Sequence, residues 1–82
     1  MQRKFAKAGV KNTMQYTIEV DREDDGRWIA ELQEIPGVMA YGASKDEAIK
    51  KAEALALRVI AEQIEHSEAA AVSFSIVLPE AA

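Results

Sequence analysis

The apolar residues of this chain recur with two different periods, and the order of the periods constrains the fold more than any other feature. Two segments near the start alternate between apolar and polar residues, as half-buried strands do, and a short apolar segment follows them. A long segment then repeats its apolar residues at helical spacing, and "VSFSIVLP" alternates again. The chain therefore predicts the element order βββαβ.

The first two strands, at residues 15–21 and 27–33, are predicted to form an antiparallel hairpin. The segment "REDDG" between them ends in Asp25 and Gly26, and Asp-Gly is a strong hairpin signal. Ile29 falls on the outer face among charged residues, which is a hint of an interface. The residues expected to face the core are Tyr16, Ile18, Val20, Trp28, Ala30 and Leu32.

A second turn and a helix start come next, around a third strand at residues 38–42. Gly37 after Pro36 can take the positive φ that a type II turn requires. Ser44 and Glu47 form a capping box, in which the serine hydroxyl accepts from the Glu47 N–H. The helix is expected to run to about residue 65. Its apolar stripe is Ala48, Ala52, Leu55, Ala56, Val59, Ile60 and Ile64.

The sheet order follows from the rules of chain connection. The helix covers one face and returns the chain, so the last strand can pair in parallel with the first through a right-handed crossover. The predicted class is α+β, a four-stranded mixed sheet in the order 3-2-1-4 with one helix on one face. In the last strand, the residues expected to point inward are Val72, Phe74, Ile76 and Leu78.

The charge of the chain is uneven. Residues 1–13 hold four basic residues and no acidic one, whereas the rest holds 6 basic and 14 acidic residues, a net charge of −8. We expect residues 1–13 to be a flexible basic tail, with a nucleic-acid arm or a natural start at Met14 as alternatives. Residues 14–82 are expected to form one domain. The acidic body disfavours unaided nucleic-acid binding and suits a basic partner.

Some classes of protein are excluded by what the sequence lacks. It has no cysteine, hence no disulfide and no Cys-based zinc site, and it has no apolar run that could span a membrane. No apolar stretch typical of a secretory signal follows the basic start. We therefore expect a cytoplasmic protein that makes no membrane contact. Because a core of this size is marginal, oligomerisation is an expected source of stability.

Acidic side chains are the main candidates for chemistry. Such carboxylates can hold a divalent metal or do acid–base work, but their spacing matches no calcium loop. We therefore expect no catalytic residue, no metal and no cofactor, and interpret the acids together with Ile29 as a partner-binding surface. The acids of the outer sheet face and the first hairpin are Glu19, Asp21, Glu23, Asp24, Asp25 and Glu31.

Other side chains have simpler interpretations. His66, the single histidine, is expected just past the helix end, where a charged imidazole favours the negative end of the helix dipole. Tyr16 and Trp28 could stack on bases, but core packing is the default at alternating strand positions. The chain contains no phosphate-binding loop, dinucleotide fingerprint or nucleophile elbow.

The segment from residue 15 to about residue 64 resembles the HicB-like antitoxin family. Shared features are the acidic hairpin with Asp-Gly and an aromatic residue, the Pro-Gly turn, and a glycine before a capped helix that opens with Glu-Ala. Two departures are Val38, where many members have cysteine, and Ala43, where aspartate is common. The matching positions are Asp25, Gly26, Trp28, Ala30, Ile35, Pro36, Gly37, Gly42, Ser44, Glu47 and Ala48.

The resemblance implies a partial RNase H-like fold without nuclease activity, and a protein that binds and masks a HicA-type mRNA interferase toxin. In that pair the toxin contributes the catalytic histidine. It also implies a homodimer or homotetramer, for which Ile29 and Leu57, which lies off the helix stripe, are candidate contacts. Many members carry a DNA-binding segment after the core. Because this chain ends soon after Pro79, we do not expect direct DNA binding.

Two alternatives come from other classes of function. The first is an orphan homo-oligomeric HicB-like protein with another regulatory or binding role. The second is a metal-dependent hydrolase that uses the carboxylates of the outer sheet face.

Overall fold

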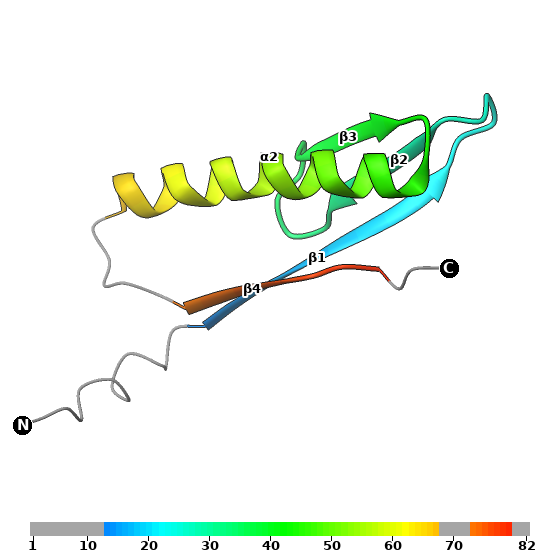
Figure 1. The fold of residues 1–82 in the computed structure, drawn as a ribbon. Helices are drawn as coiled ribbons and strands as arrows, with labels where there is room; N and C mark the ends of the chain where they lie inside the picture. Colours follow the sequence, from blue (N-terminus) through cyan, green and yellow to red (C-terminus); the bar gives the residue numbers. More distant parts are fainter. Residues whose placement is uncertain (1–12, 68–72, 80–82) are drawn as a thin grey trace, which may run out of the picture.

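Within the described residues, four strands form one mixed sheet and one helix, α2, lies on one face of it (Figure 1). The computed structural model describes residues 13–67 and 73–79. The basic tail predicted at residues 1–13 lies outside this part of the chain except for its last residue, which begins the first strand, and Val72 lies outside it as well. The elements are β1 (Thr13–Arg22), β2 (Trp28–Leu32), β3 (Met39–Gly42), α2 (Lys45–His66) and β4 (Ser73–Val77).

The sheet has the predicted order, β3-β2-β1-β4. β2 pairs antiparallel with both β1 and β3, so that Ala30 lies between Val20 and Ala40. β4 pairs in parallel with β1, which places Tyr16 beside Ile76. The longest strand, β1, is therefore central and receives β2 on one side and β4 on the other.

The hairpin between β1 and β2 is closed by a short loop that ends in a glycine. The Glu23 N–H donates to the Arg27 carbonyl at 2.7 Å, and the Gly26 N–H donates to the Glu23 carbonyl at 2.9 Å. Gly26 has a φ of 93°. This arrangement is that of a three-residue hairpin loop with a glycine bulge, as the Asp-Gly signal predicts.

The second turn has the predicted type. The Val38 N–H donates to the Ile35 carbonyl at 3.3 Å across Pro36 and Gly37, and Gly37 has a φ of 92°. A proline followed by a glycine of positive φ defines a type II turn. The turn sends the chain back along β2 as β3.

The capping box at the start of α2 is confirmed, with one difference. The Ser44 hydroxyl accepts from the Glu47 N–H at 3.1 Å, as predicted, whereas the Glu47 carboxylate accepts at 2.7 Å from the N–H of Ala43, one residue before the cap. This bond and the Lys51 ammonium, 3.2 Å from the second carboxylate oxygen, lower the pKa of Glu47 below its ordinary value. The charged form of Glu47 thus holds the helix start in place.

Gly42 allows α2 to approach the end of β3. A Cβ atom at this position would lie 2.5 Å from the backbone nitrogen of Ala48 and 3.0 Å from its Cα atom. Real Cβ atoms do not come so close to a backbone nitrogen. The glycine is therefore required by this contact rather than by its own backbone conformation.

The core lies between α2 and the inner faces of β1, β2 and β3. Trp28 and Val20 are partly buried against it, in agreement with the predicted faces of the hairpin. Ile49 is also buried, although it was not part of the predicted helix stripe, and so is Val38, just before β3. The buried residues are Tyr16, Ile18, Ala30, Leu32, Val38, Ala48, Ile49, Ala52, Ala56 and Ile60.

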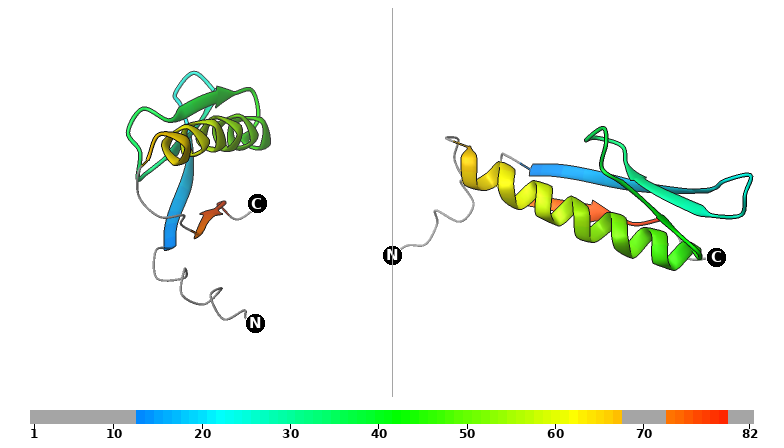
Figure 2. Two further views of the ribbon diagram at one scale, coloured as in Figure 1. Left: turned by 90° about the vertical axis from the view of Figure 1, so that its left-hand side faces the viewer. Right: turned by 90° about the horizontal axis from the view of Figure 1, so that it is seen from above.

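Three apolar residues predicted to contribute to the core are largely exposed. Ile64 is 47% exposed, Phe74 is 40% exposed and Leu78 is 43% exposed. The reason is the position of α2, which packs on β1, β2 and β3 but hardly contacts β4 (Figure 2). Within the described residues, Ile76 packs against the core as predicted, whereas Phe74, Leu78 and Ile64 in the last turn of α2 remain exposed.

Among the residues described, no helix combines the length and the apolar character needed to cross a membrane.

Candidate functional site

The acids predicted on the outer sheet face are brought together there. In the ladder between β1 and β2, Glu19 lies opposite Glu31 and Asp21 lies opposite Ile29. The side chains of these four residues point away from α2, because the alternate residues of both strands are buried beneath it. We refer to Glu19, Asp21, Ile29 and Glu31 as the acidic face.

Two like charges face each other directly on this surface. Glu19 and Glu31 are cross-strand partners and both are exposed. Within residues 13–67 and 73–79, neither carboxylate takes part in an ion pair. Like charges directly opposite in a sheet are destabilising. The acidic face therefore costs the free chain some stability, which a cation from outside could restore.

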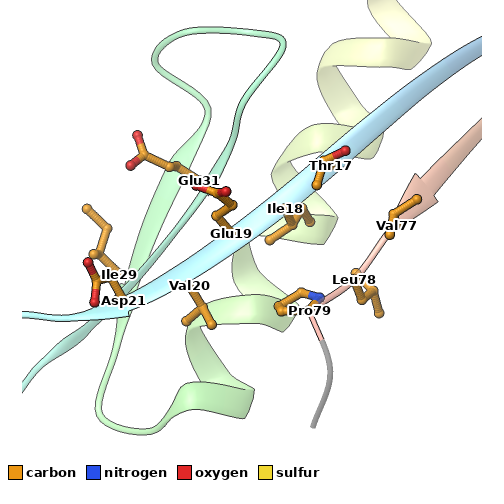
Figure 3. A pocket seen from close by; sticks show the side chains of 10 residues that line it. All are labelled: Thr17, Ile18, Glu19, Val20, Asp21, Ile29, Glu31, Val77, Leu78 and Pro79. Atoms are coloured by element: carbon orange, nitrogen blue, oxygen red, sulfur yellow. The ribbon is translucent and has the colours of Figure 1, made fainter.

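An open groove of about 580 Å³ runs along the second half of β1, next to the acidic face (Figure 3). It lies where the chain beyond β4 diverges from β1. Its walls differ in character, with the carboxylates of the acidic face on one side of β1 and apolar side chains on the other. The residues that line it are Thr17, Ile18, Glu19, Val20, Asp21, Ile29, Glu31, Val77, Leu78 and Pro79.

The remaining predicted acids, Glu23, Asp24 and Asp25, lie in the hairpin loop and do not line this groove. Asp25 is engaged within the loop, because it accepts from the Arg27 N–H at 3.0 Å and from the Arg27 Nε at 2.8 Å. The bond from the backbone N–H is the main cause that lowers the pKa of Asp25, and the guanidinium adds to it. Asp25 therefore has a structural role in the turn.

Sequence reasoning missed an aromatic residue beside the acidic face. Tyr41 lies opposite Ile29 in the ladder between β2 and β3 and is 38% exposed. The Arg27 guanidinium lies 4.2 Å from the centre of its ring. The signal that could have identified Tyr41 is its place two residues after Met39, another exposed apolar residue on the outer side of β3.

The other two aromatic candidates make contacts within the fold. Tyr16 is buried in the core, as expected. Trp28 is partly buried, and the cationic groups of Arg22 and Lys45 lie 5.5 Å and 6.0 Å from its ring centre. Both distances are within the range of a cation–π interaction.

No metal centre is formed by the residues that the structure describes, since no three His, Asp or Glu side chains among them are placed to hold one ion. His66 is the last residue of α2 rather than just past it, and its Nε2 atom lies 3.9 Å from the nearer carboxylate oxygen of Glu62. The groove presents both carboxylate and apolar side chains to the solvent.

Comparison with known proteins gives one informative result. No family model matches the chain, and no curated protein matches it. Among solved structures, the N-terminal domain of the Burkholderia pseudomallei antitoxin HicB is similar, with a TM-score of 0.58 and 28% sequence identity over 71% of this chain and 68% of that chain. The two proteins share the HicB-like fold. The similarity confirms the fold predicted from the family resemblance.

Proposed function

We propose that this chain is an antitoxin-like protein that binds a small basic toxin, a HicA-type mRNA interferase, and masks its RNA-binding site. The observation that supports this proposal most is the fold shared with the antitoxin HicB domain, at 28% identity. The proposed action is binding alone. It needs no catalytic residue, metal or cofactor from this chain.

The acidic face supplies a physical reason for such binding. A site that binds RNA must be basic, because RNA presents a row of phosphate charges. The carboxylates of Glu19, Asp21 and Glu31 present negative charges on one open surface and can take the place of phosphates. A basic partner would also relieve the repulsion between Glu19 and Glu31.

Apolar side chains next to these acids add a second component. Ile29, Met39 and Tyr41 lie on the same outer face, on β2 and β3. A binding surface commonly has an apolar centre with aromatic residues, surrounded by polar groups. The acids would guide the encounter with the toxin, and the three apolar side chains would stabilise the complex once it has formed.

Co-purification tests the proposal. The chain is expressed with one affinity tag from its native genomic neighbourhood, and the proteins that co-purify are identified by mass spectrometry. We expect a small basic protein in stoichiometric amount, whose RNA cleavage stops when the chain is added. Recovery of the chain alone, or a partner whose activity the chain leaves unchanged, would contradict the proposal.

A second candidate is a homo-oligomeric protein with another regulatory role, and exposed apolar residues favour it. Leu57 is 45% exposed on the outward side of α2, as its position off the helix stripe predicts. Phe74 is likewise exposed on β4. Sedimentation of the isolated chain tests this candidate. A dimer or tetramer that Leu57→Ser dissociates would support it, and a monomer would exclude it.

A further inference from the structure

The second half of β1 forms an open edge of the sheet. The ladder between β1 and β4 ends at the pair Thr17 and Val77, although β1 continues to Arg22. Pro79 follows soon after the end of β4 and has no N–H with which to extend the ladder. Within the described residues, no strand therefore lies beside β1 from Val20 onward on this side.

The hydrogen bonds to β2 show which backbone groups face the open edge. The Gln33 N–H donates to the Thr17 carbonyl at 3.0 Å, and the Glu23 N–H donates to the Arg27 carbonyl at 2.7 Å. The odd-numbered residues of β1 thus direct their backbone groups toward β2. Because the direction alternates along a strand, the even-numbered residues direct theirs toward the groove.

Val20 supplies the free backbone groups of this edge. The N–H of Arg22 is already taken, since it donates to the Asp21 carboxylate at 2.9 Å. For Val20, the part of the chain that the structure describes offers no hydrogen-bond partner on the groove side. The N–H and the C=O of Val20 therefore face the groove.

The side chains on the two sides of this edge have different chemistry. Glu19 and Asp21 flank it on the outer side of the sheet, together with Glu31 (Figure 3). Val20, which packs against the core, and Leu78 line the groove on the inner side. A strand that paired with β1 would place its alternate side chains against these two surfaces.

We propose that the edge of β1 from Val20 to Arg22 binds an extended segment of the basic partner by strand addition. The segment would alternate basic residues, which meet Glu19, Asp21 and Glu31, with apolar residues, which cover Val20 and Leu78. It would pair with β1 over about three residues, because the free edge spans about 10 Å. The proposal rests on the proposed function only for the identity of the partner.

The acids also indicate why the occupant is not a second copy of this chain. Two copies that paired along this edge would bring their own Glu19 and Asp21 side chains close together. Like charges on an exposed edge are a common means of preventing such self-association. The same acids attract a segment of opposite charge, so the edge selects a basic strand.

Amide hydrogen exchange measured by NMR tests the proposal. The probe is a synthetic peptide of alternating arginine and valine, about seven residues long, and the matched control replaces each arginine by glutamate. We expect the basic peptide to slow exchange of the Val20 amide at least about tenfold, because a strand hydrogen bond forms there. The effect should weaken in high salt.

Three results would overturn the proposal: no binding of the basic peptide, equal binding of the acidic peptide, or binding that leaves Val20 unprotected. The same exchange measurement on the co-purified complex separates this inference from the proposed function. A complex in which Val20 stays unprotected overturns strand addition and leaves toxin binding intact. If the peptide protects the Val20 amide but no toxin co-purifies, the edge is still supported as a site for basic strands. Only the proposed toxin partner is then overturned.

Discussion

Replacing Glu31 by glutamine should stabilise the free chain while it weakens partner binding. Glu31 and Glu19 are exposed and directly opposite each other. At a carboxylate separation of about 6 Å in water, Coulomb's law gives a repulsion of about 0.7 kcal/mol. Screening reduces this to about 0.6 kcal/mol at 10 mM salt and about 0.3 kcal/mol at 150 mM salt. The free energy of unfolding should rise by about these amounts.

Urea unfolding of a double-mutant cycle measures this repulsion. The variants are Glu19→Gln, Glu31→Gln and both together, and Glu53→Gln on α2 is the control for the change in net charge. We expect a coupling energy of about 0.6 kcal/mol at low salt that roughly halves at physiological salt. A coupling of zero at low salt, or one that does not change with salt, would refute the account of this pair.

Three further predictions concern the capped helix. Ser44→Ala removes the acceptor for the Glu47 N–H and should cost about 1 kcal/mol in urea unfolding; an unchanged midpoint would argue against the cap. Because the pKa of Glu47 is lowered in the fold, its contribution is complete above the ordinary glutamate pKa and is lost as the pH falls through the folded value. Glu47→Gln should therefore flatten the dependence of stability on pH below the ordinary glutamate pKa of 4.5, and an unaltered slope would contradict this. Gly42→Ala should cost about 2 kcal/mol through its contact with the Ala48 backbone, whereas a neutral effect would show that α2 can shift.

The parts of the fold that depend on short-range patterns could be predicted from the sequence. Alternation placed Tyr16 and Ile18 in the core, and the Pro36–Gly37 pair gave the turn type. The capping box placed the start of α2 after Ser44. These signals involve residues close together in the chain, so their geometry is set by local stereochemistry and does not depend on how the elements pack.

The errors arise where burial depends on packing between distant elements. Periodicity put Phe74 and Ile64 on apolar faces but could not show that α2 makes few contacts with β4. Ile49 was missed because its neighbour Ala48 already satisfied the helical stripe, although the stripe is wide enough to include both. The periodicity of the sequence indicates which way a side chain points. Whether that side chain is buried depends on how the helix packs on the sheet.

The candidate site was likewise predicted in part. Strand register brings Glu19, Asp21, Ile29 and Glu31 together, and alternation was sufficient to expect this. The groove could not be foreseen, because it exists only where the ladder of β4 stops short of the end of β1. The sequence-based interpretation also placed Glu23, Asp24 and Asp25 on the same binding surface as the acids of the sheet face. In the structure, these three lie in the hairpin loop and do not line the groove.

This separation allows the most direct test of the central claim, that the acids lining the groove bind the basic partner. The measurement is the dissociation constant of the co-purified partner for the chain and for two variants that each lose three negative charges by amide substitution. One variant changes Glu19, Asp21 and Glu31, and the matched variant changes Glu23, Asp24 and Asp25. We predict at least about a tenfold loss of affinity for the first and a much smaller loss for the second. Equal losses, or an unchanged affinity of the first variant, would contradict the account.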